Sequence, residues 1–439
     1  MTSFGRIVWA GVLLCGPAAA ALGQTAVHAS TAAVRAQDQT YEQLDLLVDV
    51  LNYIQENYVD ESEPQKLIYG AASGMVRTLD AFSQFMEPGV HSEIKAETDG
   101  QFGGIGIRMV MRDDWLAVLT PMPGTPAYRA GLLPNDRLVE IGGETAKDLQ
   151  VADAMDKLRG APGTKVKIKI VRWPEAAPAA EDEGTEKEFE LVRDNIKIES
   201  VQRRMLDSEA GYLRIIEFSA HTVADFHEAM RDLLGRGMKG LVLDLRHNPG
   251  GLLGAAVDVA SSFLGPDKLV VYTQGRRPDS RQEFRSGRGA PYVDLPLIVL
   301  VNEESASGSE IIAGALQDQR RALLMGSRTF GKASVQSVIP LPDKSGLRLT
   351  VARYYTPNGR SIQRDEKKKT GGITPDISVA IPRDTSDKLF AQWELIYEPG
   401  KKPRSAIRKE DMARDEVLNR AQELIRARDL LGRIKGQDQ

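Results

Sequence analysis

The feature that most constrains the fold is a regular exchange of strand-like and helix-like patterns between residues 201 and 355. Short runs rich in Val, Ile and Leu alternate with segments in which apolar side chains recur every three or four residues. This alternation predicts a mixed or parallel sheet with helices packed on its faces. The strand-like runs are Tyr212–Phe218, Gly240–Arg246, Leu269–Thr273, Leu295–Asn302, Ala322–Gly326, Val335–Pro340 and Leu347–Tyr355, and the helical patterns cover Val223–Leu234, Leu253–Leu264 and Ser309–Leu316.

The N-terminus carries the pattern of a secretory signal. Arg6 precedes the short apolar run Ile7–Gly16, and the small-residue run Pro17–Gly23 follows it. These are the three parts of such a signal, and the apolar core is too short for a permanent membrane span. We expect residues 1–23 to be a signal peptide and the mature protein to be exported to the periplasm, where it would be free or peripheral to the inner membrane. A buried N-terminal helix is the alternative.

Composition excludes several chemistries. The 439 residues contain 57 Lys and Arg against 61 Asp and Glu, a formal net charge of −4, so the chain lacks the positive field that nucleic acid favours. The single cysteine, Cys15, lies inside the signal, which leaves the mature chain without a thiol for catalysis, zinc or a disulfide. No H-E-x-x-H or G-x-S-x-G motif occurs, and His221 and His227 have the wrong spacing for zinc. We expect no metal, no cofactor and no nucleic acid partner.

Helical patterns lie at both ends of the mature chain. Within residues 40–100, apolar side chains recur at helical spacing in Tyr41–Tyr58 and again after Pro64, which predicts an N-terminal helical region. Residues 386–439 are predicted to be a C-terminal helical tail, whose apolar face consists of Val417, Leu418, Ala421, Leu424 and Ile425. That face suits packing on the body or on another subunit, so a homo-oligomer formed through the terminal helices remains open.

Residues 101–193 have a different organisation, with a glycine-rich run followed by strands and one helix. The run Phe102–Ile107 leads into an alternating strand, and Trp115–Thr120 is its expected hairpin partner. A helix over Val151–Leu158 and strands over Lys165–Arg172 and Lys187–Arg193 follow. In this order the block resembles a PDZ domain. Its glycines leave backbone N–H groups free to bind a carboxylate, and the next strand can pair with an extended peptide. The predicted peptide-binding residues are Phe102, Gly103, Gly104, Ile105, Gly106 and Ile107; a glycine-rich hairpin without a ligand is the alternative.

The strongest local signal lies in Leu295–Asp318, where an apolar strand runs through a tight polar turn into a helix. Ser307 and Glu310 have the S-x-x-E spacing of a capping box, which makes Ser307 the predicted N-cap of that helix. Taken alone, the pattern predicts a capping serine and nothing more.

A second signal is Lys332, which follows Phe330-Gly331 at the entrance to an apolar strand. Desolvation there would disfavour the ammonium form, lower the lysine pKa and give a neutral amine able to take a serine proton. Gln336 lies four residues further on and would share a face with Lys332 in an extended strand, where it could hold the amine. A surface lysine with its stem packed on the protein is the alternative.

Together these motifs resemble the carboxyl-terminal processing peptidases, also called tail-specific proteases, which are exported serine proteases with a Ser–Lys dyad. The match covers Tyr41–Ile381, and its motifs stand in family order. Besides the PDZ-like block, they are Leu243–Gly251, Ser305–Glu310, Gly314–Asp318, Thr329–Lys332, Arg353–Ile362 and Ile373–Asp376.

The resemblance implies a multidomain fold: the helical arm, a PDZ domain, a crotonase-like α/β serine-protease core over residues 194–385 and the helical tail. It implies that Ser307 is the nucleophile, Lys332 the general base and Gln336 the residue that orients the base. An N–H of Gly250 or Gly251 and the N–H of Gly308 would form the oxyanion hole, since a helix N-terminus offers unpaired N–H groups to negative charge. Asp318 matches an aspartate sometimes implicated in the family.

Some positions depart from the family pattern. Glu303 and Glu304 stand in the turn where glycines are usual, Gly308 stands where alanine is usual, and Ala333 where glycine is usual. Ser305 and Ser309 flank Ser307 closely enough for a misassignment, and His247, directly after the predicted strand Gly240–Arg246, would serve a histidine mechanism.

The sequence therefore predicts an exported serine endopeptidase that captures proteins or peptides with free apolar C-termini and cuts upstream of them, with or without an adaptor protein. Two other functions remain in view: a catalytically inert PDZ scaffold that binds protein C-termini, and a small-ligand binder on a crotonase-like fold.

Overall fold

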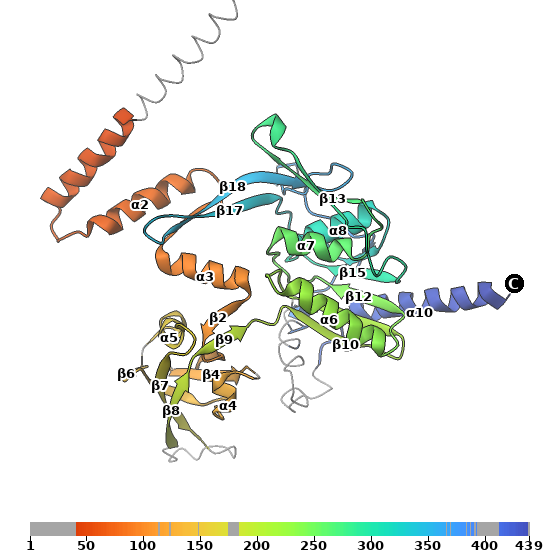
Figure 1. Ribbon diagram of the computed structural model, residues 1–439, viewed down its shortest axis with the longest axis horizontal. Coiled ribbons are helices and arrows are strands. Elements are labelled where there is room, and N and C mark those ends of the chain that lie inside the picture. The colour runs from red at the N-terminus through yellow and green to blue at the C-terminus, as the bar shows by residue number, and fades with distance from the viewer. Residues whose placement is uncertain are drawn as a thin grey trace, which may run out of the picture. The chain divides into compact units, whose positions relative to one another are not determined.

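The structure is a computed structural model (Figure 1). It describes residues 41–112, 115–122, 124–147, 149–173, 184–365, 367–368, 370–382, 384–386, 388–389, 392 and 412–437. The predicted signal, residues 1–23, lies outside this range. Contacts divide the chain into two units that meet in sequence between Leu79 and Asp80.

The first unit is helical, as predicted. One helix covers residues 41–57, and α2 (Pro64–Arg77) follows after a short break. Pro64 occupies the first turn of α2, where its missing N–H costs no hydrogen bond. Many large apolar side chains of this unit are exposed; Tyr53 is 71% accessible.

Within the second unit, residues 101–197 form a small β body. Its main sheet has the order β3-β4-β5-β7-β8, with β6 beside β5, and β2 pairs separately with β9. In β7, Val166, Ile168 and Ile170 point into the core and alternate with lysines, as the period of a strand requires. The elements are β2 (Gln101–Gly104), β3 (Ile107–Arg112), β4 (Trp115–Pro121), α4 (Pro126–Arg129), β5 (Arg137–Ile141), β6 (Glu144–Thr145), α5 (Val151–Leu158), β7 (Lys165–Arg172), β8 (Thr185–Val192) and β9 (Asp194–Lys197).

The larger body is built on a six-stranded sheet with the order β10-β11-β12-β15-β16-β19. Only β10 runs antiparallel to its neighbour, so the predicted mixed sheet is confirmed. The strands are β10 (Val201–Met205), β11 (Ala210–Ile215), β12 (Gly240–Asp244), β15 (Leu297–Val301), β16 (Leu323–Gly326) and β19 (Ile377–Ser378). The helices are α6 (Thr222–Gly235), α7 (Leu253–Ser261), α8 (Gly308–Asp318) and α10 (Glu416–Gln437).

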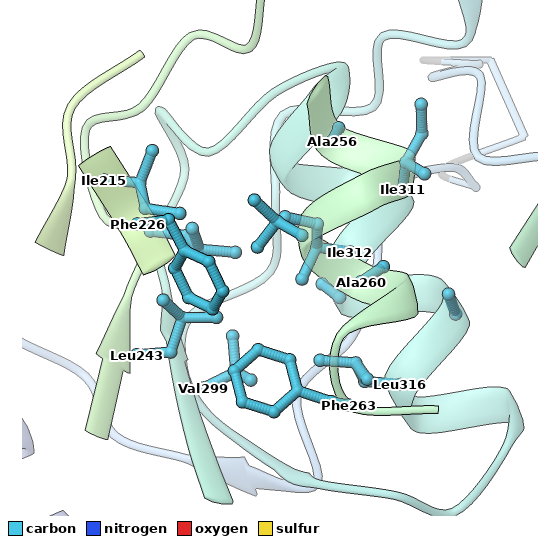
Figure 2. Packing of buried hydrophobic residues seen from close by; sticks show 14 of the residues in the cluster. Ile215, Phe226, Leu243, Ala256, Ala260, Phe263, Val299, Ile311, Ile312 and Leu316 are labelled. Atoms are coloured by element: carbon cyan, nitrogen blue, oxygen red, sulfur yellow. The ribbon is translucent and has the colours of Figure 1, made fainter. Parts of the chain in front are cut away.

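Side chains that alternate along these strands point into two apolar layers, one on each face of the sheet. Leu241 and Leu243 of β12 pack with α6, α7 and α8, whereas Val242 between them faces the layer that contains α10. Figure 2 shows the first layer, in which Phe263 and Leu316 lie close to Val299 of β15. The predicted apolar face of the C-terminal helix thus packs on the body, with Val417, Leu418, Ala421 and Ile425 buried.

Not all of the predicted strands lie in this mixed sheet. A second, antiparallel sheet has the order β1-β18-β13-β14, with β17 on β18. Its strands are β1 (Gln84–Met86), β13 (Leu269–Gly275), β14 (Gln282–Arg285), β17 (Ser334–Pro340) and β18 (Gly346–Tyr355); α3 (Pro88–Asp99) and a short 3₁₀ turn, η1 (Pro278–Ser280), accompany them. Strand propensity alone does not determine which strands pair with each other. Here β17 and β18 form a hairpin, and both β13 and β1 pair with the other side of β18.

Candidate active site

Ser307 lies at the junction of β15 and α8 and is the N-cap of α8. Its φ of +51° places a non-glycine residue in the left-handed region, a strained conformation that persists only when the surroundings enforce it. Glu310 closes the predicted capping box, because its Oε2 accepts the Ser307 N–H at 3.0 Å.

The two neighbouring serines are occupied elsewhere. Ser305 is fully buried and its hydroxyl donates to the Leu245 carbonyl at 2.8 Å. Ser309 is also fully buried and donates to the Asn248 carbonyl at 3.0 Å. Both hydroxyls hold the turn together, whereas Ser307 is half-buried at its surface.

Glu310 connects the serine turn to the lysine turn. Its carboxylate has no exposed surface and accepts four hydrogen bonds. Oε2 takes the N–H groups of Ser307 (3.0 Å) and Lys332 (2.8 Å), and Oε1 takes the Gly331 N–H (2.7 Å) and the Thr329 hydroxyl (2.5 Å). Burial raises the pKa of Glu310 to about 6, although these hydrogen bonds favour its ionised form. The sequence indicated only the cap; the bonds to the second turn come from residues about twenty positions away.

Lys332 is half-buried just before β17. Burial lowers the pKa of its ammonium, Arg348 lowers it further, and Glu310 acts in the opposite direction. The Lys332 Nζ lies 5.0 Å from the centroid of the Phe82 ring, and the Gln336 Nε2 donates to the Phe82 carbonyl at 2.6 Å. Lys332 and Gln336 therefore reach the same residue despite a β-bulge between Val335 and Gln336. Within the described residues, the Gln336 side chain bonds to Phe82 and not to the lysine amine.

Tyr354 is a further residue of the site, and the sequence pattern did not single it out. Its ring is buried, its hydroxyl donates to the Lys332 carbonyl, and the Ser307 side chain acts to lower its pKa. Burial raises the pKa of Tyr354 well above its usual value, so the hydroxyl stays neutral.

The glycine turn after β12 packs against the start of α8. Gly250 has a φ of +105°, and a Cβ at this position would lie 2.6 Å from the Ser307 Cβ, so only glycine fits. The same point is 2.9 Å from the backbone nitrogen of Gly308, the first residue of α8. The Gly250 N–H itself donates to Asn248 Oδ1 at 2.8 Å. Gly251 follows with a φ of +135°, close against the Phe218 carbonyl.

Two other sequence candidates have partners other than Ser307. Asp318 ends α8, ten residues or about 15 Å along the helix from Gly308, where it pairs with Arg360 and accepts the Asn358 N–H. Asp318 therefore lies at the opposite end of α8 from Ser307. His247 has its Nδ1 3.9 Å from Glu304 Oε2, and burial lowers its pKa.

In the small body, the predicted peptide-binding run spans β2, the Ile105-Gly106 link and the start of β3. Gly106 has a φ of +76°, and its carbonyl accepts the Met122 N–H, which folds the link tightly. β3 is the end strand of its sheet, and α5 packs beside it. An end strand next to a helix is the geometry in which an extended peptide can add to a sheet.

Within the described ranges, no three His, Cys, Asp or Glu side chains come together as a metal site. Over the same part of the chain, no helix is both long and apolar enough to cross a membrane.

Matches to family models identify the class of protein to which the chain belongs. The model of peptidase family S41 matches residues 209–379, a PDZ domain model matches 118–172, and the model of the N-terminal domain of the activating protease CtpB matches 8–89. The chain is thus a serine peptidase whose core is accompanied by a PDZ domain, a module that binds peptide C-termini.

The relatives give the particular family. The chain is 39% identical over 360 residues to the carboxy-terminal-processing protease of Bartonella bacilliformis, covering 81% of this chain and 79% of that one. It is 32% identical over 389 residues to the carboxy-terminal processing protease CtpB of Bacillus subtilis, covering 86% and 77%. A solved photosystem II D1 C-terminal processing protease is 31% identical over 77% of this chain and 93% of that one, with a TM-score of 0.43. The protein belongs to the carboxyl-terminal processing serine proteases of family S41, which confirms the resemblance found in its motifs.

Proposed function

We propose that the protein cleaves peptide bonds with Ser307 as nucleophile and Lys332 as general base. The neutral Lys332 amine takes the hydroxyl proton as Ser307 Oγ attacks the scissile carbonyl carbon. The resulting ammonium gives that proton to the leaving amine, which departs and leaves an acyl-enzyme. Water then attacks the ester, and the lysine moves one proton from water to Ser307 Oγ, so the acid product leaves and the enzyme is restored.

The observation that carries this assignment is the single oxygen shared by the two residues. Glu310 Oε2 accepts the backbone N–H of both Ser307 and Lys332, so these residues are fixed next to each other. Ser305 and Ser309 are buried in bonds to carbonyls and are poor nucleophiles in this arrangement. Gln336 would orient the Lys332 amine once the Gln336 side chain has left the Phe82 carbonyl.

The oxyanion hole in this proposal consists of the Gly308 N–H and one N–H of the glycine turn. The close approach of Gly250 to Ser307 and to the Gly308 nitrogen supports this position. Because Asn248 already accepts the Gly250 N–H, Gly251 is the better second donor.

Substrate selection would use the PDZ domain. A free C-terminal carboxylate would bind the run Phe102–Ile107, and the residues before it would pair with β3 beside α5. Proteins and peptides with apolar C-termini are the proposed substrates, cut upstream of the captured end.

Substitution of the dyad tests the mechanism. Ser307→Ala and Lys332→Ala should each reduce peptide cleavage on the order of 10³-fold or more, with losses that do not add. Lys332→Arg should fail too, since guanidinium stays protonated. His247→Ala should keep most activity. An active Lys332→Ala with a dead His247→Ala would contradict the dyad, and an inactive wild type that binds peptides would favour the scaffold function instead.

Export and assembly complete the proposal. Residues 1–23 would direct export to the periplasm, so the protein recovered from its host should begin between Ala21 and Ser30; a cytoplasmic protein that keeps Met1 would contradict this. The exposed apolar side chains of residues 41–79 suit a homo-oligomer or an adaptor, which sedimentation of the full chain would distinguish. The mixed, mostly parallel sheet with α6, α7 and α8 on one face supports a crotonase-like core.

A further inference from the structure

A short segment before α3 reaches the catalytic lysine. We call residues Asp80–Met86 the strap. Phe82 in the strap makes two contacts with the site: its ring lies 5.0 Å from Lys332 Nζ, and its carbonyl accepts the Gln336 amide at 2.6 Å. An ammonium at this distance from an aromatic centroid is within the range of a cation–π interaction.

The strap holds Phe82 in place. The Asp80 carboxylate accepts the N–H groups of Phe82 (2.7 Å) and Ser83 (2.8 Å) and also the Ser83 hydroxyl. Ser83 Oγ in turn accepts the Thr350 N–H at 3.1 Å, and β1 pairs with β18 directly after Phe82. The backbone of Phe82 is therefore held by Asp80 and, through Ser83 and β1, by the second sheet.

The Lys332 amine contacts a group other than Ser307. Its Nζ faces the Phe82 ring, whose centroid lies 5.0 Å away. Within the described residues, no hydrogen bond joins Ser307 Oγ to Lys332 Nζ. An aromatic face attracts the ammonium and has no such attraction for the neutral amine, so Phe82 stabilises the form of Lys332 that cannot act as a base.

We propose that Phe82 is a positioning residue that holds Lys332 in a protonated resting position, and that displacement of Phe82 releases the lysine toward Ser307. On release, the ammonium loses one proton to solvent and the neutral amine can then take the Ser307 proton. The other groups that face this lysine are Arg348 and Tyr354 of β18 and Glu310 of α8. This inference rests on the proposed dyad.

The test compares ring substitutions in the full-length protein by single-turnover peptide cleavage across pH. Phe82→Leu keeps apolar bulk but removes the ring, so the rise of the rate with pH should move to lower pH and the rate at neutral pH should increase about 2- to 30-fold. Phe82→Trp should shift the curve the other way, because Trp gives the strongest cation–π interaction. Phe82→Tyr should resemble wild type.

Phe85→Leu is the matched control, because it removes an aromatic ring from the same strap. It should leave the pH curve in place. A Phe82→Leu curve that coincides with wild type, or a rate loss without a pH shift in both Leu variants, would overturn the proposal. If Phe82→Leu does not fold, the direction of the Phe82→Trp shift decides alone. Lys332→Ala distinguishes a failure of the proposed dyad from a failure of the role proposed for Phe82. Cleavage by that variant would refute the dyad. An inactive Lys332→Ala together with an unmoved pH curve for Phe82→Leu would refute only the role of Phe82.

Discussion

Replacing Glu310 by Gln tests whether one buried carboxylate fixes both halves of the proposed dyad. Gln keeps the size of Glu but has a single acceptor oxygen. If that oxygen takes the place of Oε2, it serves Ser307 and Lys332, and the amide nitrogen then faces the Gly331 N–H. In the opposite orientation, the nitrogen faces the N–H groups of both Ser307 and Lys332. The Thr329 hydroxyl can rotate and accept a hydrogen bond from the amide nitrogen, but a backbone N–H can only donate.

The better orientation therefore leaves one buried N–H without an acceptor, which costs about 1–3 kcal/mol. The turns can avoid this cost only by moving apart, and then Ser307 and Lys332 lose their alignment. If the full cost appears in the transition state, the maximal rate of single-turnover cleavage should fall roughly 5- to 150-fold.

The pH dependence should change in a direction that simple damage to the site does not produce. Glu310 raises the pKa of Lys332 through its negative charge, so the neutral Gln should lower that pKa and move the rise of the rate with pH to lower values. In wild type, protonation of Glu310 near its pKa of about 6 should add a second loss at acid pH, and the variant should lack it.

The assay is single-turnover cleavage of a quenched-fluorescent peptide with a free apolar C-terminus, measured from pH 5 to 10. Asp207→Asn is the matched control, because Asp207 accepts the N–H groups of Glu209 and Ala210 in a turn between β10 and β11. It should lower stability without changing the pH curve. An unchanged maximal rate in Glu310→Gln, or a rise displaced to higher pH, would refute the reasoning.

Three further predictions concern other parts of the chain. Gly104→Trp should crowd the PDZ loop and weaken binding of free-acid peptides in calorimetric titration, while equal binding of amidated and free-acid peptides by the wild type would contradict carboxylate capture. Asp415→Asn should lower the free energy of unfolding by about 1–3 kcal/mol in urea titration, because Asp415 pairs with the buried Arg246 and accepts the Leu418 N–H at the start of α10. An Asp415→Asn variant as stable as wild type would exclude a role for Asp415. Arg246 also pairs with Asp244: burial alone would raise the pKa of Asp244, but Arg246 outweighs burial and lowers that pKa. The stability that the Asp244 carboxylate provides should therefore be present above about pH 4 and lost in more acid solution.

The sequence was informative where the chemistry lies in a short window. The strand, turn and helix around Ser307 and the entry of Lys332 into β17 follow from local patterns, and the structure has those elements within a few residues of the predicted bounds. Gln336 shows the limit of such reasoning, because its amide bonds to Phe82, 254 residues away. No periodicity in either segment could indicate that contact, and the same holds for the choice of β18 as the partner of β1 and β13.

The turn around Ser307 carries two unfavourable free-energy terms, the buried charge of Glu310 and the strained backbone of Ser307. Its pKa of about 6 in the fold lies above the ordinary value of 4.5, so its contribution to stability is full below pH 4.5 and falls as the pH rises through 6, by about 2 kcal/mol at pH 7. The left-handed φ of Ser307 adds on the order of 1–3 kcal/mol of strain. The fully buried side chains of Ile312 and Leu316 of α8 (Figure 2) each contribute about 1.5–3 kcal/mol and can offset both terms. The apolar layer under α8 thus permits a turn whose charge and backbone conformation are unfavourable alone, and that turn is the one that places Ser307 beside Lys332.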